Sequence, residues 1–282
     1  MSAELTREFH FTTQDFQLIS KLIYQRAGIS LIASKQELVY SRLARRLRST
    51  GIKTFAEYLE RLQCGDVAEW EEFTNALTTN LTSFFREAHH FQIMTDHLHK
   101  LGKGRPIQLW CSACSTGEEA YSMAMTAVEA FGSFDNPVKI VASDLDTKVL
   151  ESARIGRYKL ESVAKMTSQR VDKFFVRGNG EDAGFVNVRP ELQKMIIFRW
   201  VNLLDAIWPI RGHLDAIFCR NVMIYFDKPT QLEVLKKFAP LLRSDGLLFA
   251  GHSENFFHAD AYFKLRANTV YELAAQYQKI PT

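Results

Sequence analysis

The segment Leu109-Trp-Cys-Ser-Ala-Cys-Ser-Thr-Gly-Glu-Glu-Ala-Tyr121 passes from an apolar run into small residues and then into a helical pattern. Small side chains at a strand end allow a ligand to approach the backbone, as in doubly wound proteins that bind nucleotides beside the carboxyl ends of their strands. The segment has neither the G-x-G-x-x-G pattern nor the Lys-Ser/Thr ending of a phosphate-binding loop. It therefore predicts a ligand site that is not built for a triphosphate.

The sequence around this segment predicts a doubly wound α/β domain with a mostly parallel sheet. From about Pro106, short apolar runs alternate with amphipathic segments, which is typical of a sheet covered by helices on both faces. The predicted strands are residues 107–111, 138–143, 195–201, 214–219 and 246–250, and the predicted helices are residues 117–131, 147–154 and 229–242. Two final runs, 262–265 and 269–273, predict a terminal antiparallel hairpin.

The residues before this region predict only helices. Thr12 and Asp15 form a pattern typical of a capping box, and Phe16, Ile19 and Ile23 follow at helical spacing. We therefore expect an N-terminal helical domain over residues 1–77 and a second domain over residues 78–282. Within the second domain, two β-like runs joined by turn residues predict a small antiparallel insertion at about residues 156–194.

A second predicted N-terminal helix carries a basic face. Its apolar side has Val39, Leu43 and Leu47. Four cationic residues fall together on another face at 100° per residue: Lys35, Arg42, Arg45 and Arg46. From the residues alone, a solvated surface and a docking surface explain this face equally well.

Composition narrows the functional classes. The chain has 282 residues, 46% of them hydrophobic, which predicts a globular protein with a large core. No N-terminal leader pattern and no apolar run of membrane-spanning length is apparent, so we expect a cytoplasmic protein without membrane insertion. The net charge of +3 is too mild to make nucleic acid the first partner to consider.

Acidic residues at the end of the second predicted strand are candidate ligand contacts. Asp144 stands at the strand end, where a carboxylate accepts hydrogen bonds from both hydroxyl groups of a ribose. Asp146 immediately precedes a predicted helix and suits the role of its N-cap. We therefore favour Asp144 as the ribose contact.

Two further polar runs are candidates of a similar kind. Residues 77–87 contain Asn80, Thr82 and Arg86, although a capped helix start followed by core phenylalanines explains this run without a ligand. Residues 220–227 follow an apolar strand, where ligand-binding loops gather, and supply Asn221 and Tyr225 as candidates.

The cysteines and histidines predict no metal site. Cys111 and Cys114 form a C-x-x-C pattern, but no second pair is present to complete a zinc site, and we assign both to packing at the strand end. The eight histidines are scattered, apart from the neighbours His89 and His90. Reduced thiols are expected.

Five strings together resemble the CheR family of methyltransferases. They are residues 80–87 (Asn-Leu-Thr-Ser-Phe-Phe-Arg-Glu), 114–119 (Cys-Ser-Thr-Gly-Glu-Glu), 143–146 (Ser-Asp-Leu-Asp), 220–226 (Arg-Asn-Val-Met-Ile-Tyr-Phe) and 251–254 (Gly-His-Ser-Glu). The resemblance spans essentially the whole chain and is specific because all five strings occur in order. One departure is Ala120, where many relatives have proline.

The resemblance implies an S-adenosylmethionine-dependent methyltransferase that leaves S-adenosylhomocysteine and forms methyl esters on glutamate side chains of chemotaxis receptors. It implies these cofactor contacts: Asn80, Thr82, Arg86, Glu119, Asp144, Asn202, Leu203, Arg220 and Asn221. It also implies that the basic helical face binds the acidic receptor, and that the β insertion binds a peptide at a receptor's end. We hypothesise that Arg86 or Tyr225 orients the incoming carboxylate.

Two other functions are compatible with this fold class. A nucleic-acid methyltransferase on the same fold needs an Asn/Asp-Pro-Pro-Tyr or Pro-Cys string, and neither occurs here. A non-catalytic adaptor that keeps the fold is disfavoured because the set of cofactor residues is intact.

Overall fold

The computed structural model describes residues 7–278, which divide into two compact units. The first unit contains the described residues up to Thr79 together with Tyr225–Asp227. The second contains Asn80–Ile224 and the described chain from Lys228 onward. The segment Tyr225–Asp227 therefore groups with the N-terminal helices although it lies far away in the sequence.

The first unit is helical, as predicted. Its helices are α1 (Thr13–Ala27), α2 (Gln36–Thr50), α3 (Phe55–Gln63) and α4 (Val67–Leu77), with a 3-10 turn at Ala33–Lys35. The capping box that begins α1 is confirmed, because Thr12 N donates to Asp15 Oδ2 at 2.8 Å and Asp15 N donates to Thr12 Oγ1 at 3.0 Å. The predicted apolar side chains of α1 are buried.

The basic face of α2 is smaller than the sequence predicts. Arg46 pairs with Glu69 and Glu72, and Arg42 donates to backbone carbonyls at the end of α4, including Leu77 at 3.0 Å. Helix α4 packs against α2, a contact between segments that helical periodicity does not reveal. Only Lys35 and Arg45 of the four are exposed.

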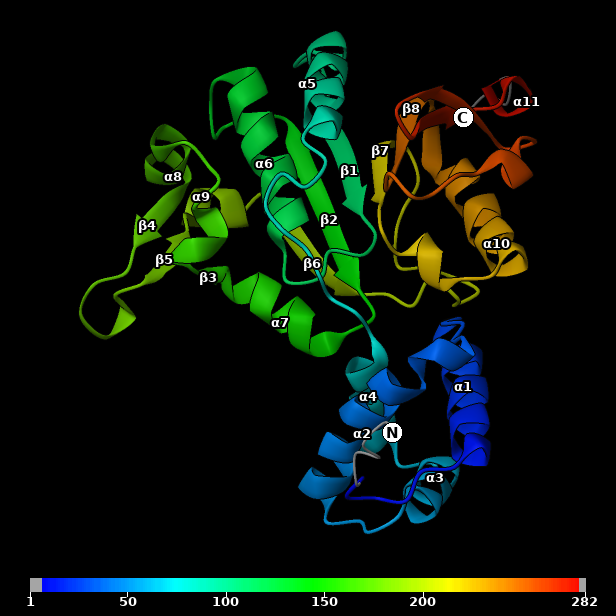
Figure 1. Ribbon diagram of the computed structural model, residues 1–282. Coiled ribbons are helices and arrows are strands. Elements are labelled where there is room, and N and C mark those ends of the chain that lie inside the picture. Colours follow the sequence, from blue (N-terminus) through cyan, green and yellow to red (C-terminus); the bar gives the residue numbers. More distant parts are fainter. Residues whose placement is uncertain (1–6, 279–282) are drawn as a thin grey trace, which may run out of the picture. The chain divides into compact units, whose positions relative to one another are not determined.

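The second unit is built on a seven-stranded, mostly parallel sheet (Figure 1), so the predicted fold class is confirmed. In spatial order its strands are β6 (Ile196–Trp200), β2 (Val138–Asp144), β1 (Ile107–Cys111), β7 (Leu214–Cys219), β8 (Leu242–Ala250), β10 (Val270–Leu273) and β9 (Phe263–Ala267). The first five run parallel, and β10 is antiparallel to β8 and β9. The predicted terminal hairpin is thus β9 and β10.

Helices accompany this sheet in the predicted alternation. They are α5 (His89–Leu101), α6 (Glu118–Phe131), α7 (Thr147–Ile155), α10 (Lys228–Phe238) and a short α11 (Ala275–Gln278). Helix α5 was not predicted, and α10 ends earlier than predicted because Ala239–Leu241 forms a 3-10 turn containing Pro240. Among the described residues, no helix combines the length and apolar character needed to cross a bilayer.

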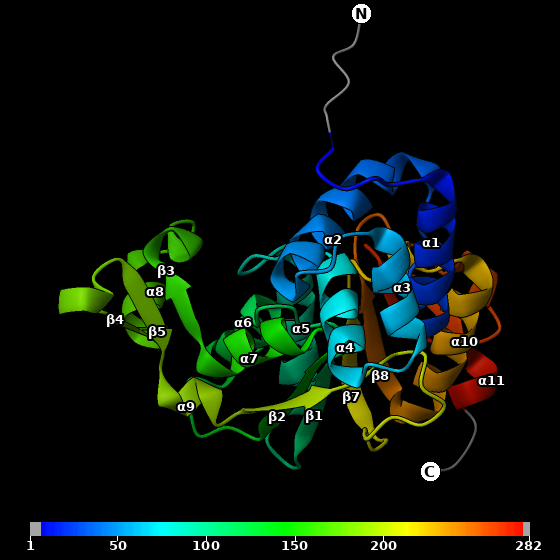
Figure 2. The ribbon, with the colours of Figure 1, turned by 90° about the horizontal axis from the view of Figure 1, so that it is seen from below.

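A small antiparallel sheet lies between α7 and β6 in the sequence. Its strand order is β3-β5-β4, with β3 (Arg157–Lys159), β4 (Phe175–Arg177) and β5 (Phe185–Val188). Two short helices belong to the same insertion, α8 (Ser168–Phe174) and α9 (Pro190–Gln193), and Figure 2 shows it as a lobe beside α7. The antiparallel insertion is as predicted. Strand β3 was not predicted, because three residues are too few to show an alternation of apolar and polar side chains.

Gly117, at the start of α6, has a positive φ and is closely surrounded by other atoms. Its φ is +98°, and a Cβ placed there would lie 2.8 Å from Ala153 Cβ and 2.9 Å from the Tyr158 hydroxyl. Gly132 at the other end of α6 has φ +71° but nothing within 4 Å of its added Cβ. Gly117 therefore allows the start of α6 to approach α7 and β3 closely.

Replacing Gly117 with alanine should cost more stability than replacing Gly132. Both changes place a Cβ at a positive φ, at about 1–2 kcal/mol each. Gly117→Ala additionally forces a methyl group into packed atoms, which costs about 1–3 kcal/mol more. Urea denaturation followed by circular dichroism measures the difference, and equal losses for the two variants would show that the crowding at residue 117 is relieved without cost.

Candidate functional site

The carboxyl ends of β1 and β7 define the candidate site. These strands are neighbours, and the chain leaves the end of β1 toward β2 on one side, while β7 and β8 continue the sheet on the other. Such a reversal of strand order opens a crevice for a ligand. The segment that follows β1 begins with Ser112, whose backbone N donates to Phe218 O at 2.9 Å.

Asp144 lies at the end of β2, beside the loop that follows β1. Ser115 N donates to its Oδ2 at 2.8 Å, and Asp146 N donates to its Oδ1 at 3.0 Å. The side chain is buried, and burial raises the pKa of Asp144 to about 6. Each carboxylate oxygen has two lone pairs, so one on each remains for a ligand hydroxyl group.

Asp146 has the structural role that the sequence predicts. Its side chain caps α7 by accepting from Lys148 N at 2.9 Å and Val149 N at 3.2 Å. The side-chain amide of Asn80 donates to Asp146 Oδ2 at 2.8 Å, and Asn80 O accepts from the Ser115 hydroxyl at 3.0 Å. Asn80 therefore ties the start of the second unit to the loops after β1 and β2.

Arg220 and Glu119 form a buried ion pair between the end of β7 and the start of α6. Arg220 Nη1 lies 2.7 Å from Glu119 Oε2, and the Arg220 side chain is fully buried. Cys111 donates its thiol to the other Glu119 oxygen at 3.2 Å. Burial raises the pKa of Glu119, although Arg220 acts against this shift.

Glu87 is a second acidic partner of Arg220. It is not among the candidates that the sequence predicts. Its Oε2 lies 3.2 Å from Arg220 Nη2, and its Oε1 accepts from the Asn221 side chain at 3.4 Å. Burial alone would raise the pKa of Glu87, but Arg220 and hydrogen bonds from His252 and Asn221 lower it to about 2. Arg220 also donates to the backbone carbonyl of Arg86.

Backbone strain is concentrated around these residues. Four non-glycine residues at the site have positive φ: Phe85 (+52°), Glu87 (+56°), Ser115 (+49°) and Asn221 (+58°). Such conformations are costly for residues with a Cβ and persist where the surrounding contacts enforce them, which occurs frequently at ligand sites. Two of them flank Arg86.

Glu254 is a further residue that sequence reasoning left without a role. It is buried, and one of its oxygens accepts from Gly251 N and from Asn221 N, the latter at 2.9 Å. A Cβ on Gly251 would lie 2.3 Å from Asn221 Nδ2, so only glycine fits beside this strained residue. The string Gly-His-Ser-Glu therefore supports the conformation of Asn221.

The other residues that the sequence predicts for the site are Arg86, Thr82, Asn202, Leu203 and Tyr225. Arg86 donates from its guanidinium group to Leu81 O at 2.9 Å, and Thr82 is half-buried in the same segment. Asn202 and Leu203 are buried and follow Val201, whose N donates to Asp144 O at 3.1 Å. Tyr225 groups with the helical unit, where its carbonyl accepts from Ser30 N at 2.8 Å.

The cysteines lie where packing was predicted. Cys111, Cys114 and Cys219 are buried free thiols, and burial raises the pKa of all three. A raised pKa disfavours the reactive thiolate form. Packing, with hydrogen bonds from Cys111 to Glu119 and from Cys114 to Ser115 O, accounts for the C-x-x-C pattern.

Two family models match almost the whole chain. Residues 80–271 match the CheR methyltransferase SAM-binding domain, and residues 14–78 match the CheR methyltransferase all-alpha domain. The first match identifies S-adenosylmethionine as the cofactor of the sheet domain, and loss of its methyl group leaves S-adenosylhomocysteine.

Curated relatives agree over nearly their full length. The chain is 54% identical over 269 residues to chemotaxis protein methyltransferase 2 of Pseudomonas aeruginosa, covering 95% of this chain and 96% of the relative. It is 49% identical over 272 residues to the chemotaxis protein methyltransferase of Escherichia coli, covering 96% and 94% respectively. With buried carboxylates and a guanidinium group at the strand ends of a doubly wound sheet, this chain belongs to the CheR family of S-adenosylmethionine-dependent methyltransferases.

Proposed function

We propose that this chain transfers the methyl group of S-adenosylmethionine to glutamate side chains of chemotaxis receptors, which forms glutamate methyl esters. The observation that carries the proposal is 54% identity, across nearly all of both chains, to a relative named as a chemotaxis protein methyltransferase. The site chemistry supports it, since the residues around β1, β2 and β7 suit a nucleoside with an amino-acid tail and no phosphate.

The donor set fits S-adenosylmethionine group by group. Asp144 retains a lone pair on each oxygen and is the proposed partner of the two ribose hydroxyls. Glu119 and Arg220 offer one negative and one positive group for the amino and carboxyl ends of the methionine part. Arg220 Nε is buried and has no hydrogen-bond partner among the described residues, so it is a further donor that the bound cofactor would satisfy.

The remaining cofactor residues keep the roles that the family resemblance implies. We assign Asn80, Thr82 and Arg86 to one side of the bound cofactor. Asn202 and Leu203, which follow β6, and Asn221, which follows β7, complete the set. Asn80 acts partly through Asp146, since its side-chain amide holds the loop that begins α7.

The reaction needs positioning more than proton transfer. S-adenosylmethionine supplies an electrophilic methyl group on a positively charged sulfur, which takes up the C–S electron pair when the methyl group leaves. A glutamate side chain with a pKa of about 4.3 is already ionised at neutral pH, so no general base is required. Alignment of the carboxylate with the C–S bond then contributes most of the acceleration, up to about 7–11 kcal/mol in favourable cases.

Arg86 and Tyr225 are the proposed orienting residues for the incoming carboxylate. Arg86 sits between two residues with positive φ, and Arg220 holds its backbone carbonyl, so its position is tightly constrained. An arginine in this role must bind the carboxylate loosely, because the negative charge disappears as the ester forms. Tyr225 would contribute a hydroxyl group without adding charge.

Two surfaces are proposed for the receptor. The first is the basic face of α2, where Lys35 and Arg45 are exposed and suit an acidic helical partner, while Arg42 and Arg46 are held within the unit. The second is the small sheet, in which β3 and β4 each pair with β5 on one side only. An extended peptide can add to such an edge strand by backbone hydrogen bonds.

Methyl transfer to receptors is directly measurable. Purified protein with methyl-labelled S-adenosylmethionine should label receptors in chemoreceptor-containing membranes, and base should release the label, because esters hydrolyse under conditions that leave N-methyl groups intact. Membranes whose receptors carry glutamine at the modified positions are the control. Base-stable label, or label on added nucleic acid instead, would contradict the proposal.

Arg86→Ala should lower kcat by about 100-fold, the effect of removing one well-placed electrostatic group. Binding of S-adenosylhomocysteine should fall by a much smaller factor, because Asp144, Glu119 and Arg220 remain. Steady-state kinetics and calorimetry measure the two effects, with the exposed Arg45→Ala as the matched arginine control for turnover once receptor is saturating. Unchanged kcat in Arg86→Ala would remove Arg86 from the orienting role.

A further inference from the structure

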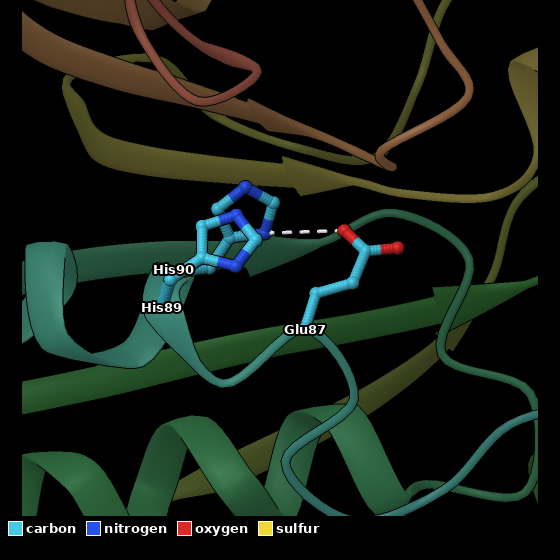
Figure 3. A group of neighbouring side chains, drawn as sticks. All are labelled: Glu87, His89 and His90. Carbon is cyan, nitrogen blue, oxygen red and sulfur yellow. Dashed lines mark ion pairs between the residues drawn. The ribbon is translucent and has the colours of Figure 1, made fainter.

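A cluster of three metal-ligating side chains lies beside the cofactor residues. Glu87, His89 and His90 each offer one ligand atom, and these atoms all lie within 4.8 Å of one another (Figure 3). Glu87 is partly buried, His90 is fully buried and His89 is exposed. The cluster therefore extends from the core at His90 to the solvent at His89.

The hydrogen bonds of His90 determine which of its nitrogen atoms is free. Nε2 lies 2.9 Å from the backbone carbonyl of Asn268, and a carbonyl only accepts, so Nε2 carries the hydrogen. In the neutral ring, Nδ1 then holds a lone pair. A histidine whose second nitrogen donates to a backbone carbonyl is the usual arrangement of a metal ligand.

The lone pair of His90 Nδ1 points toward another acceptor. Glu87 Oε2 lies 3.6 Å away and is ion-paired with Arg220, but neither Glu87 Oε2 nor His90 Nδ1 accepts a hydrogen bond among the described residues. Two facing acceptors repel each other unless a proton or a metal ion lies between them. Two ligands of a tetrahedral zinc ion, each at about 2.0–2.1 Å, lie about 3.4 Å apart, which is close to the observed separation.

The position of His89 favours a metal ion over a proton as the group that Glu87 and His90 share. A shared proton needs only Glu87 and His90, whereas the third nitrogen within reach completes a set of two imidazoles and one carboxylate. That set is typical of zinc and neighbouring transition metals, and differs from the all-oxygen sites of Mg²⁺ and Ca²⁺. We propose that Glu87, His89 and His90 bind a zinc-class divalent cation, with a fourth position open to water.

The surroundings supply an outer shell for this site. Arg220 lies 3.2 Å from Glu87 Oε2, and His252 Nδ1 lies 3.2 Å from Glu87 Oε1. Polar contacts of this kind orient a ligating carboxylate. They also connect the metal to the cofactor residues, because Arg220 pairs with Glu119 through its other nitrogen.

Because Arg220 contacts both Glu87 and Glu119, we expect a metal ion bound to Glu87 to inhibit methyl transfer. This consequence rests on the proposed function. A dication on Glu87 competes with Arg220 for the same oxygen and adds positive charge near a site for a positively charged sulfonium cofactor. Metal and S-adenosylmethionine should therefore weaken each other's binding by the same factor. Metal binding itself does not depend on methyl transfer and is measured separately.

The test is calorimetric titration of the full-length, untagged protein with Zn²⁺ in a non-chelating buffer, without cofactor. One equivalent should bind, and Co²⁺ should give the visible absorption of a four-coordinate site. His89→Gln, an exposed change that leaves the core intact, should weaken Zn²⁺ binding by at least about tenfold, since even outer-shell changes cost that much. The equally exposed His10→Gln should have no effect.

Glu87→Gln provides a second variant that keeps the side-chain shape and should weaken binding similarly. Absence of Zn²⁺ uptake, or uptake that neither His89→Gln nor Glu87→Gln changes, would overturn the proposal and leave a proton as the group shared by Glu87 and His90. If the unmodified protein binds Zn²⁺ but does not methylate receptors, the proposed function is contradicted and the metal site is not.

Discussion

The structure of the candidate site at the strand ends depends on one buried guanidinium group. Arg220 contacts Glu119 from the helix after β1 and Glu87 from the segment before α5, and it donates to the backbone of Arg86. A buried arginine is stable only when its charge is compensated and its donors are used. Its two carboxylate partners come from distant parts of the sequence, so the ion pairs exist only when the sheet, α6 and the 80–87 segment are assembled together.

This dependence explains why the strained residues are tolerated. Phe85 and Glu87 on either side of Arg86, and Asn221 after Arg220, have positive φ. Glu254 binds the backbone of Asn221, and Glu87 is held by Arg220. The cost of these conformations, about 1–3 kcal/mol each, is offset by contacts that form only in the folded state. The result is a set of polar groups whose positions are established before a ligand arrives.

Much of the fold was predictable because its signals are local. Runs such as residues 107–111 and 214–219 are apolar except for Gln108 and Asp215, as expected for strands in a sheet covered by helices, and both strand boundaries are as predicted. Asp146 was predictable as an N-cap from its position before a helix, and the position of Asp144 at the end of a strand was predictable from the apolar run before it. The three-residue strand β3 was not, because its pairing with β5 depends on the insertion folding as a whole.

The missed residues are those whose partners are distant in sequence. Glu87 was within the recognised 80–87 string, but nothing local indicates that it meets Arg220, 133 positions later. Glu254 was likewise part of a recognised string without a partner to give it a role. The same limit made the basic face of α2 look larger than it is, since Glu69 and Glu72, which bind Arg46, lie on another helix. The roles of Asn202, Leu203 and Tyr225 rest on the family resemblance.

The central claim is that the buried Arg220 network holds the groups that bind S-adenosylmethionine. Calorimetry with S-adenosylhomocysteine on the double variant Arg220→Met/Glu119→Gln tests it most directly, since it removes the two paired charges together while Glu87 keeps its contacts with Asn221 and His252. The account predicts a protein that remains folded by circular dichroism but binds at least about 100-fold more weakly, a loss of about 2.8 kcal/mol. A folded double variant that binds with unchanged affinity would contradict it.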